Sequence, residues 1–218
     1  MSYQIAIDGP AGAGKSTIAR RVAKEKGFIY VDTGAMYRAM AYYLLTRKID
    51  PADGEAIEKS CIDADITIQY ENGEQVVFLN GENVNGMIRS EEVGNMASIS
   101  SKNPRVRERL THLQKELAKS NDVVMDGRDI GTCVLPDADV KVYLTASAGV
   151  RAKRRFYELT AKGESCDIKK IEEDIITRDK QDMNREIAPL RQAEDAVLLD
   201  SSDMSIDEVV SAILKLCR

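Results

Sequence analysis

Short apolar runs alternate with amphipathic stretches at the start of the chain. The run at 3–8 and the sequence FIYVD at 28–32 have the length and composition of buried strands. A helix is expected to begin near Lys15 and to end at Gly27, and a second helix is expected to follow Gly34. This order of strand, helix, strand and helix favours a parallel sheet.

The same alternation returns in the second half of the chain. VVMD at 123–126, VKVYL at 140–144 and AVLLD at 196–200 predict three more strands. The fold class expected is therefore α/β, a doubly wound core with a five-stranded parallel sheet and helices on both faces. The helices of this half are expected from a Ser147 cap to about Lys162, from an Asp167 cap towards Asn184, and after the capping box of Ser205 and Glu208.

A small module interrupts this pattern at about 63–85. It contains three β-prone runs separated by Asn72-Gly73 and Asn80-Gly81. Asn-Gly between such runs is the strongest short-range signal for a hairpin, so we expect a three-stranded antiparallel insert. Two helices should follow, the second capped by Asn103 with Pro104 at its first position.

The composition of the chain limits the classes of partner that it is expected to bind. The 218 residues carry a net charge of −5, and 31% of them are charged with both signs mixed. No global basic field favours a nucleic-acid polymer or an anionic membrane. No apolar stretch has the length of a membrane-spanning helix, and the first apolar run leads into a glycine loop rather than a leader cleavage site, so we expect a cytoplasmic protein.

The cysteines and the single histidine offer no catalytic arrangement. The four cysteines are far apart in sequence, which favours reduced thiols over a metal site. His112 lies in a helical pattern and is expected on the helix surface. Chemistry based on a histidine triad or on a His/Cys zinc site is therefore nearly excluded.

A phosphate-binding motif follows the first predicted strand and opens the first predicted helix. Its sequence, GPAGAGKS, fits G-x-x-x-x-G-K-[ST]. In such a loop, backbone N–H groups surround phosphate oxygens, the lysine reaches the β- and γ-phosphates, and the hydroxyl residue contacts Mg²⁺. The residues expected to bind a nucleoside triphosphate are Gly9, Pro10, Ala11, Gly12, Ala13, Gly14, Lys15, Ser16 as the Mg²⁺ ligand, and Thr17.

The motif alone does not define the reaction, because GTPases, transport ATPases and small-molecule kinases share it. The chain has no Asn-Lys-x-Asp sequence late in the chain to read guanine, and no Leu-Ser-Gly-Gly-type signature of a transport ATPase. These absences argue against a GTPase and a transport ATPase.

A group of charges follows the predicted strand at 123–126. Asp126 could hold a metal, Arg128 could hold a phosphate, and Asp129 could read a substrate. The alternative is an ordinary strand end with solvated charges. Ligands of open α/β sheets bind beyond the carboxyl ends of the strands, which favours a functional role.

Other candidates occupy predicted strand ends and helices. Thr33, Tyr37 and Arg38 follow the second strand, and the spacing of Arg178, Asp182 and Arg185 puts them on one helical face. Arg151, Arg154 and Arg155 would suit a mobile flap over a triphosphate. Each group alone could be a solvated surface, but guanidinium groups match phosphate oxygens, and a kinase with two phosphorylated substrates has several negative charges to neutralise.

In order along the chain, GPAGAGKST, DTGAMYR, PRVRE, DGRDIGT and RDKQDMNR resemble the bacterial cytidylate kinases over essentially the whole length. The resemblance implies a P-loop kinase core (1–33, 120–150 and 163–218), an NMP-binding domain with the β insert (34–119) and a short LID (151–162). It also implies a monomer that transfers the γ-phosphoryl group of ATP, with Mg²⁺, to CMP or dCMP in pyrimidine metabolism. The same-fold alternatives are UMP, adenylate and shikimate kinases, and a non-catalytic nucleotide-binding regulator is a further one.

The resemblance also implies roles for individual residues. Lys15, Asp126, Arg128 and Arg185 would be catalytic, and Arg151 and Arg155 would lie against ATP. The acceptor would be contacted at its base by Thr33, Arg107 and Asp129, at its sugar by Ser98, Arg178 and Asp182, and at its phosphate by Tyr37, Arg38 and Arg128, with Arg185 at the transferring group.

Overall fold

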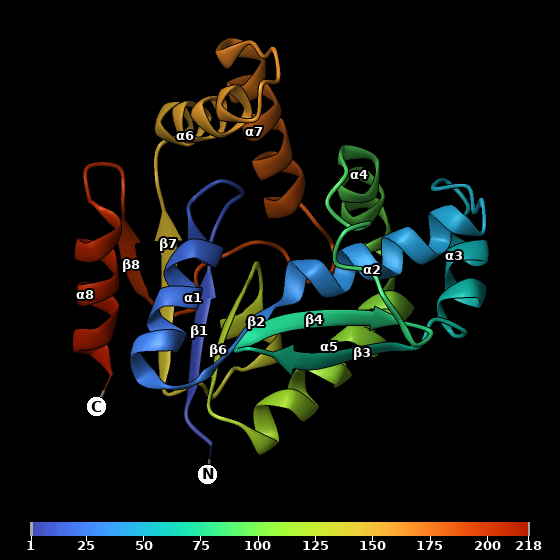
Figure 1. The fold of residues 1–218 in the computed structure, drawn as a ribbon, viewed down its shortest axis with the longest axis horizontal. Coiled ribbons are helices and arrows are strands. Elements are labelled where there is room, and N and C mark those ends of the chain that lie inside the picture. Colours follow the sequence, from blue (N-terminus) through green and yellow to red (C-terminus); the bar gives the residue numbers. More distant parts are fainter. Residues whose placement is uncertain (1, 218) are drawn as a thin grey trace. The chain divides into compact units, whose positions relative to one another are not determined.

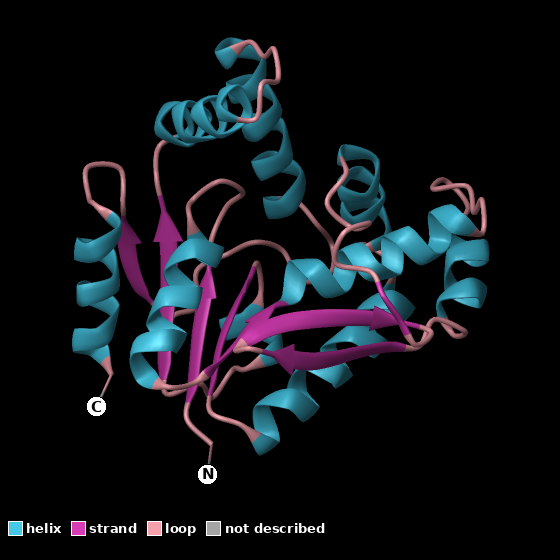
Figure 2. Cartoon of the chain, in the orientation of Figure 1, coloured by secondary structure: helices cyan, strands magenta, loops and turns pink. Residues whose placement is uncertain are grey.

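The computed structural model describes residues 2–217 and has an α/β fold. A five-stranded parallel sheet has the order β2-β6-β1-β7-β8, with helices on both faces, and a separate three-stranded sheet has the order β3-β4-β5 (Figures 1 and 2). The strands are β1 (Gln4–Asp8), β2 (Ile29–Asp32), β3 (Ile66–Glu71), β4 (Glu74–Leu79), β5 (Glu82–Asn83), β6 (Val123–Gly127), β7 (Val140–Thr145) and β8 (Val197–Asp200). The helices are α1 (Lys15–Lys26), α2 (Thr33–Thr46), α3 (Gly54–Cys61), α4 (Glu91–Ser100), α5 (Pro104–Ser120), α6 (Ala148–Ala161), α7 (Ile168–Met183) and α8 (Ile206–Leu216), with a π-helical turn at Ile130–Val134.

The chain folds into two compact units. The first ends at Phe28 and resumes at Asp122, and the second is Ile29–Asn121. The domain boundaries expected above, including a separate LID, stay a prediction.

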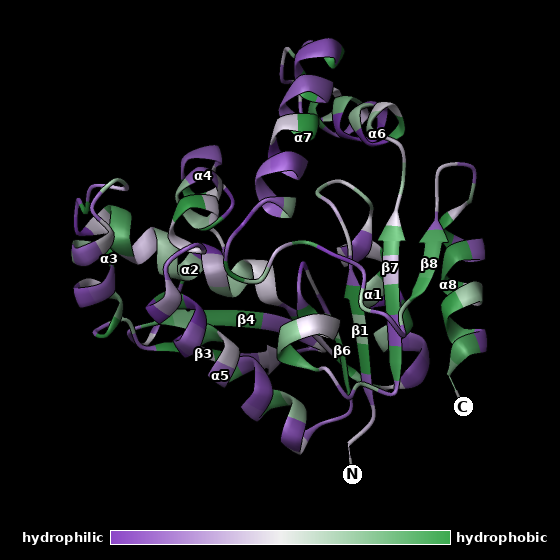
Figure 3. Ribbon diagram, turned by 180° about the vertical axis from the view of Figure 1, so that it is seen from behind, coloured by the Kyte–Doolittle hydropathy of each residue, from purple (hydrophilic) through white to green (hydrophobic). Residues whose placement is uncertain are grey.

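The first unit is built around β1, whose Ile5, Ala6 and Ile7 are at most 1% exposed. This strand pairs in parallel with β6 on one side and β7 on the other, and Asp8 lies opposite Gly127 of β6. Figure 3 shows the central strands as mostly hydrophobic. The sheet therefore supplies a rigid edge from which the loops after β1 and β6 emerge.

The second unit is built around α2. Met36, Ala39, Met40 and Leu44 on this helix are fully buried, and the helix packs on α4, α5 and strand β4. Asn72 and Gly73 both have positive φ, as the tight hairpin between β3 and β4 requires. The insert expected at about 63–85 is therefore confirmed.

The predicted helix caps and helix ends are also confirmed in most places. Gly27 ends α1 in the left-handed conformation, Asn103 caps α5, and Ser205 with Glu208 forms the capping box of α8. His112 lies exposed on α5, and all four cysteines are free. The helix caps follow from short-range hydrogen bonding, which the sequence encodes directly.

Three expectations were wrong or incomplete. Helix α2 begins at Thr33, not after Gly34, because the Asp32 carboxylate accepts a hydrogen bond from the Ala35 N–H (2.8 Å) and so caps the helix earlier. Helix α3 and the π-helical turn were not anticipated. The third correction concerns Arg185, which lies beyond the end of α7 and so does not share its helical face.

Candidate active site

The phosphate loop runs between β1 and α1 and is shaped by its glycines. A Cβ on Gly9 would lie 1.9 Å from the carbonyl oxygen of Leu144 in β7, so no side chain fits there. Gly12 and Gly14 have φ values of +75° and +89°, which glycine adopts without strain. Gly14 is also the N-cap of α1, so the loop's N–H groups and the positive end of the helix dipole meet at the loop.

The loop lysine is buried. Lys15 is 6% exposed, and its Nζ donates to the carbonyl oxygen of Pro10 at 2.8 Å. Burial and, second, the nearby Arg128 lower the pKa of Lys15 from 10.5 to about 7. Asp126, Asp8 and Asp182 act in the opposite direction, so charged groups from three separate segments influence this one ammonium group.

Ser16 and Asp126 form a pair at the start of α1 and near the end of β6. The Ser16 hydroxyl donates to Oδ2 of Asp126 at 3.0 Å. Asp126 is 5% exposed, whereas Ser16 is exposed. A buried carboxylate next to an accessible hydroxyl presents the oxygen ligands that Mg²⁺ prefers.

Asp8 is a second buried strand-end carboxylate that the sequence analysis did not single out. Its two oxygens accept hydrogen bonds from the backbone N–H groups of Ile130 (2.8 Å) and Gly131 (2.7 Å). Burial raises the pKa of Asp8 to about 6, against the opposing effect of these two hydrogen bonds. Since Asp129 immediately precedes the π-helical turn, Asp8 fixes the backbone on which Asp129 sits.

Arg128, Asp182 and Arg185 form one buried ion-pair network. Arg128 Nε donates to Oδ2 of Asp182 at 2.9 Å, and Arg185 donates to the other oxygen of the same carboxylate. Asp182 is 1% exposed, while the Arg128 side chain is 22% exposed. Two arginines on one carboxylate leave a net positive charge, which suits the binding of a phosphate.

The arginines of α6 differ in their surroundings. Arg151 is 5% exposed and pairs with Asp179 of α7 at 2.6 Å, and its NH1 donates to the Ala11 carbonyl at 2.9 Å. Arg154 NH2 donates to the Ser201 carbonyl at 2.7 Å. Arg155 is exposed and pairs only with Glu158 in the ion pairs of the described chain.

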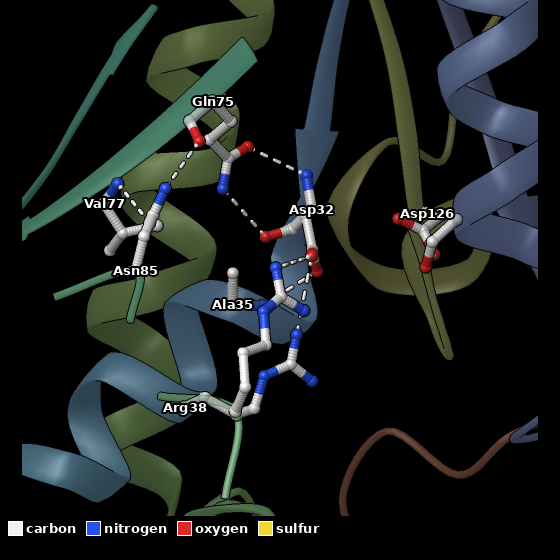
Figure 4. Close-up of polar contacts among 9 residues, drawn as sticks. Asp32, Ala35, Arg38, Gln75, Val77, Asn85 and Asp126 are labelled. Atoms are coloured by element: carbon white, nitrogen blue, oxygen red, sulfur yellow. Dashed lines mark hydrogen bonds and ion pairs between the residues drawn. The ribbon is translucent and has the colours of Figure 1, made fainter. Parts of the chain in front are cut away.

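In the second unit, Asp32 is the centre of a polar network (Figure 4). Its Oδ2 lies 3.4 Å from an Arg38 nitrogen and 3.3 Å from an Arg89 nitrogen. The Gln75 side chain of β4 accepts a hydrogen bond from the Asp32 N–H (2.9 Å) and donates one to the Asp32 carbonyl (3.1 Å). The β insert is thereby joined to the residue that holds both arginines.

The other expected acceptor residues lie in the same unit. Arg107 is 6% exposed, donates to the Ser101 carbonyl at 3.4 Å, and places its guanidinium 5.7 Å from the centre of the Tyr37 ring. Thr33 is buried at the first position of α2, and Ser98 is half-buried on α4. In the first unit, Arg178 is exposed on α7 and Thr17 is exposed on α1.

Sequence reasoning missed Asp8, Asp32, Asp179, Gln75 and Arg89. A signal existed for two of them, because Asp8 and Asp32 end apolar strands just as Asp126 nearly does. No local signal marks Asp179, Gln75 or Arg89, whose partners depend on tertiary packing.

A glycine loop joining a parallel strand to a helix, with a buried lysine and a Ser–Asp pair, defines a phosphotransferase of the P-loop class. The model of the family described as cytidylate kinase matches residues 5–218, and the chain belongs to this family. A cytidylate kinase of Caldicellulosiruptor bescii is 52% identical over 97% of this chain and 94% of its own length. One from Shouchella clausii is 48% identical over 99% of this chain and 96% of its own length.

A solved structure supports the fold alone. An uncharacterized protein from Eubacterium ventriosum aligns with a TM-score of 0.52 and 12% identity, covering 99% of this chain and 97% of that one. The family uses ATP as phosphoryl donor. No helix among residues 2–217 is both long and apolar enough to cross a membrane.

Proposed function

We propose that this protein transfers the γ-phosphoryl group of ATP to CMP or dCMP, giving ADP and CDP or dCDP. The observation that carries the proposal is the cluster of charges around Lys15, which receives contributions from Arg128, Asp126 and Asp182. Phosphoryl transfer needs such a cluster, because charge must be neutralised on both reacting phosphates.

On the donor side, the backbone N–H groups of the loop and of the start of α1 surround the phosphates of ATP, and Lys15 reaches the β- and γ-phosphates. Lys15 Nζ donates to the Pro10 carbonyl, so its side chain lies along the loop that binds these phosphates. Thr17 adds a hydroxyl to the phosphate cage. Arg155, which is exposed on α6, lies against ATP, whereas every guanidinium nitrogen of Arg151 donates to the protein.

Mg²⁺ fits at Ser16 and Asp126. No group of three or more His, Cys, Asp or Glu side chains in residues 2–217 forms a metal site. A magnesium ion bound with ATP needs only one or two protein oxygens, since phosphates and waters complete its shell. Ser16 would hold the ion, Asp126 would orient the Ser16 hydroxyl through its hydrogen bond, and the ion would supply positive charge to the transferring phosphate.

On the acceptor side, Arg128 and Arg185 hold the phosphate of CMP, and the family resemblance assigns Tyr37 and Arg38 to the same phosphate. Asp182 keeps the two arginines of the first unit in position. The attacking phosphate oxygen is already ionised, so no general base is required. Catalysis then consists of positioning and charge neutralisation.

Asp129, Arg107 and Thr33 read the base. Cytosine has an exocyclic amine that donates to Asp129 and a ring nitrogen or carbonyl that accepts from Arg107. Uracil reverses the donor and acceptor at these positions, and a mismatched buried polar group costs about 1–3 kcal/mol. Ser98, Arg178 and Asp182 contact the sugar.

The segments have separate tasks in this proposal. Residues 34–119 bind the nucleoside monophosphate, residues 151–162 form the LID over ATP, and the remaining core holds the phosphate loop. The enzyme acts as a monomer in the cytoplasm, because its substrates are small and its net charge of −5 offers no field for membranes or nucleic acids.

The test is a coupled assay of ADP release with CMP, dCMP, UMP, AMP, GMP and shikimate as acceptors. CMP and dCMP should give the largest kcat/KM. Turnover with AMP equal to that with CMP would overturn the proposal. Asp129→Ala should raise the KM for CMP far more than that for ATP, and an equal loss would remove Asp129 from base reading.

A further inference from the structure

Arg151 contacts the phosphate loop, and each of its three guanidinium nitrogens donates a hydrogen bond to the protein. Its Nε donates to the Ala146 carbonyl at 2.9 Å, its NH1 to the Ala11 carbonyl at 2.9 Å, and its NH2 to Asp179 at 2.6 Å. A Cβ on Gly12 would lie 3.4 Å from the Cβ of Arg151, so the side chain also packs against the loop. The loop is therefore held by α6 through a side chain that is 5% exposed.

Asp179 orients the guanidinium group of Arg151. Asp179 is 9% exposed and projects from α7, which packs against α6. One oxygen accepts from Arg151, and the other has no hydrogen-bond partner among the described residues. A buried carboxylate with a single cationic partner holds that partner strongly, because an unpaired charge on either side would be costly.

We propose that Asp179 is a positioning residue of the ATP site, acting through Arg151 to fix the carbonyl of Ala11 and thus the phosphate-binding N–H groups of the loop. It touches neither nucleotide. The inference rests on the proposed function only in naming ATP as the occupant of the loop.

The geometry distinguishes this role from direct charge binding by Arg151. Three of the five N–H groups of Arg151 donate to the protein over 2.6–2.9 Å, and the residue is 5% exposed, so its guanidinium is directed at the protein rather than at solvent. A lysine at position 151 would keep the positive charge but has no planar fork with which to join three acceptors. The two roles therefore predict different results for the same substitution.

The experiment compares Asp179→Ala, Asp179→Asn, Arg151→Lys and Arg151→Met with wild type, using KM values for ATP and CMP and the rise in Tm with ATP alone. Asp179→Ala should raise the KM for ATP about tenfold, the loss expected for a charge-assisted hydrogen bond. Asp179→Asn should be intermediate, because its amide keeps a neutral acceptor. The KM for CMP should stay within about twofold.

Glu173→Ala is the matched control. It removes an exposed carboxylate from α7, the helix that carries Asp179, and its KM for ATP should match wild type. Arg151→Lys should be as impaired as Arg151→Met. The proposal would be wrong if Arg151→Lys bound ATP as well as wild type does. It would also be wrong if Asp179→Ala lowered Tm without changing the KM for ATP.

Failure of the proposed CMP kinase activity would be distinguishable from failure of the positioning role of Asp179. If wild type did not phosphorylate CMP, the Tm shift with ATP would still report on the phosphate loop. A full ATP-induced shift in Asp179→Ala would then reject the positioning role on its own.

Discussion

The Ser16 hydroxyl donates to Oδ2 of Asp126 at 3.0 Å, joining the phosphate loop to the end of β6. The two residues are 110 positions apart, yet parallel pairing of β1 with β6 brings their segments together. Asp126 is buried and Ser16 is exposed, so the carboxylate is fixed and the hydroxyl is accessible to a ligand.

Ser16→Ala should weaken the Mg²⁺-dependent part of ATP binding. Loss of one oxygen ligand should raise the Mg²⁺ concentration for half-maximal binding by about tenfold, while binding of ATP without metal changes little. Calorimetric titration with ATP at several Mg²⁺ concentrations measures this. Ser16→Thr keeps the hydroxyl and serves as control; an unchanged Mg²⁺ dependence in Ser16→Ala would place the ion elsewhere.

ATP binding should take up a proton above neutral pH. Burial lowers the pKa of Lys15 to about 7, so at pH 8 most of the free protein carries a neutral amine. The triphosphate favours the ammonium form and raises this pKa, so close to one proton enters on binding at pH 8, and ATP affinity falls as pH rises above about 7.

Calorimetry in buffers of different ionisation enthalpy counts these protons. In Lys15→Arg the guanidinium stays charged at every pH used, so uptake at position 15 should vanish. Equal proton uptake by wild type and this variant would assign the proton to another group.

The Asp8 carboxylate should make the folded state less stable as pH rises from about 4 to 6. Its pKa is raised from 3.8 to about 6, so the folded protein binds more protons than the unfolded chain in that window. The stability from this group is present below pH 4 and is lost as pH rises through 6, by about 3 kcal/mol at most.

The comparison is wild type against Asp8→Asn by denaturant unfolding at each pH. The free energy of unfolding of wild type minus that of Asp8→Asn should fall between pH 4 and 6. Asp139→Asn is the control, because the Asp139 carboxylate also accepts a backbone hydrogen bond (from Gln4, 2.8 Å) but is exposed. A flat difference for Asp8→Asn would contradict the raised pKa.

Asp32→Asn should separate helix capping from arginine positioning. Asparagine caps helices about as well as aspartate, so α2 should remain stable. Its neutral amide, however, cannot form ion pairs with Arg38 and Arg89. The KM for CMP should therefore rise several-fold, while the KM for ATP stays near the wild-type value.

Asp53→Asn is the matched substitution in the same unit. Asp53 caps α3 by accepting from Ala56 (2.9 Å), and no arginine pairs with it among the described ion pairs. Its kinetics should match wild type. An unchanged KM for CMP in Asp32→Asn would show that Arg38 and Arg89 do not need this carboxylate.

Local features of the fold were predictable because they depend on neighbours in sequence. The glycine loop before Lys15, the Asn72-Gly73 turn and the Ser205 capping box each use hydrogen bonds or dihedral angles within a few residues. The family of the chain was predictable for the same reason, since its motifs are short and ordered.

The start of α2 and the position of Arg185 were harder to predict from the sequence. Gly34 looked like the break before the helix, but the Asp32 side chain accepts a hydrogen bond from the Ala35 N–H, and the helix begins at Thr33, two residues earlier than expected. Periodicity placed Arg185 on the face of α7, but the helix ends at Met183, and the contact with Asp182 forms from the segment that follows.

The order of residues along the chain was enough to specify the alternation of strands and helices, the phosphate loop and the set of arginines available for phosphates. How these arginines are used depends on tertiary packing: Arg151 joins Asp179 and the Ala11 carbonyl, and Arg128 joins Asp182. A hydrophobic period specifies which face of an element is buried. The choice among acidic partners depends on strand register and on the packing of α6 against α7, which bring together residues far apart in the chain.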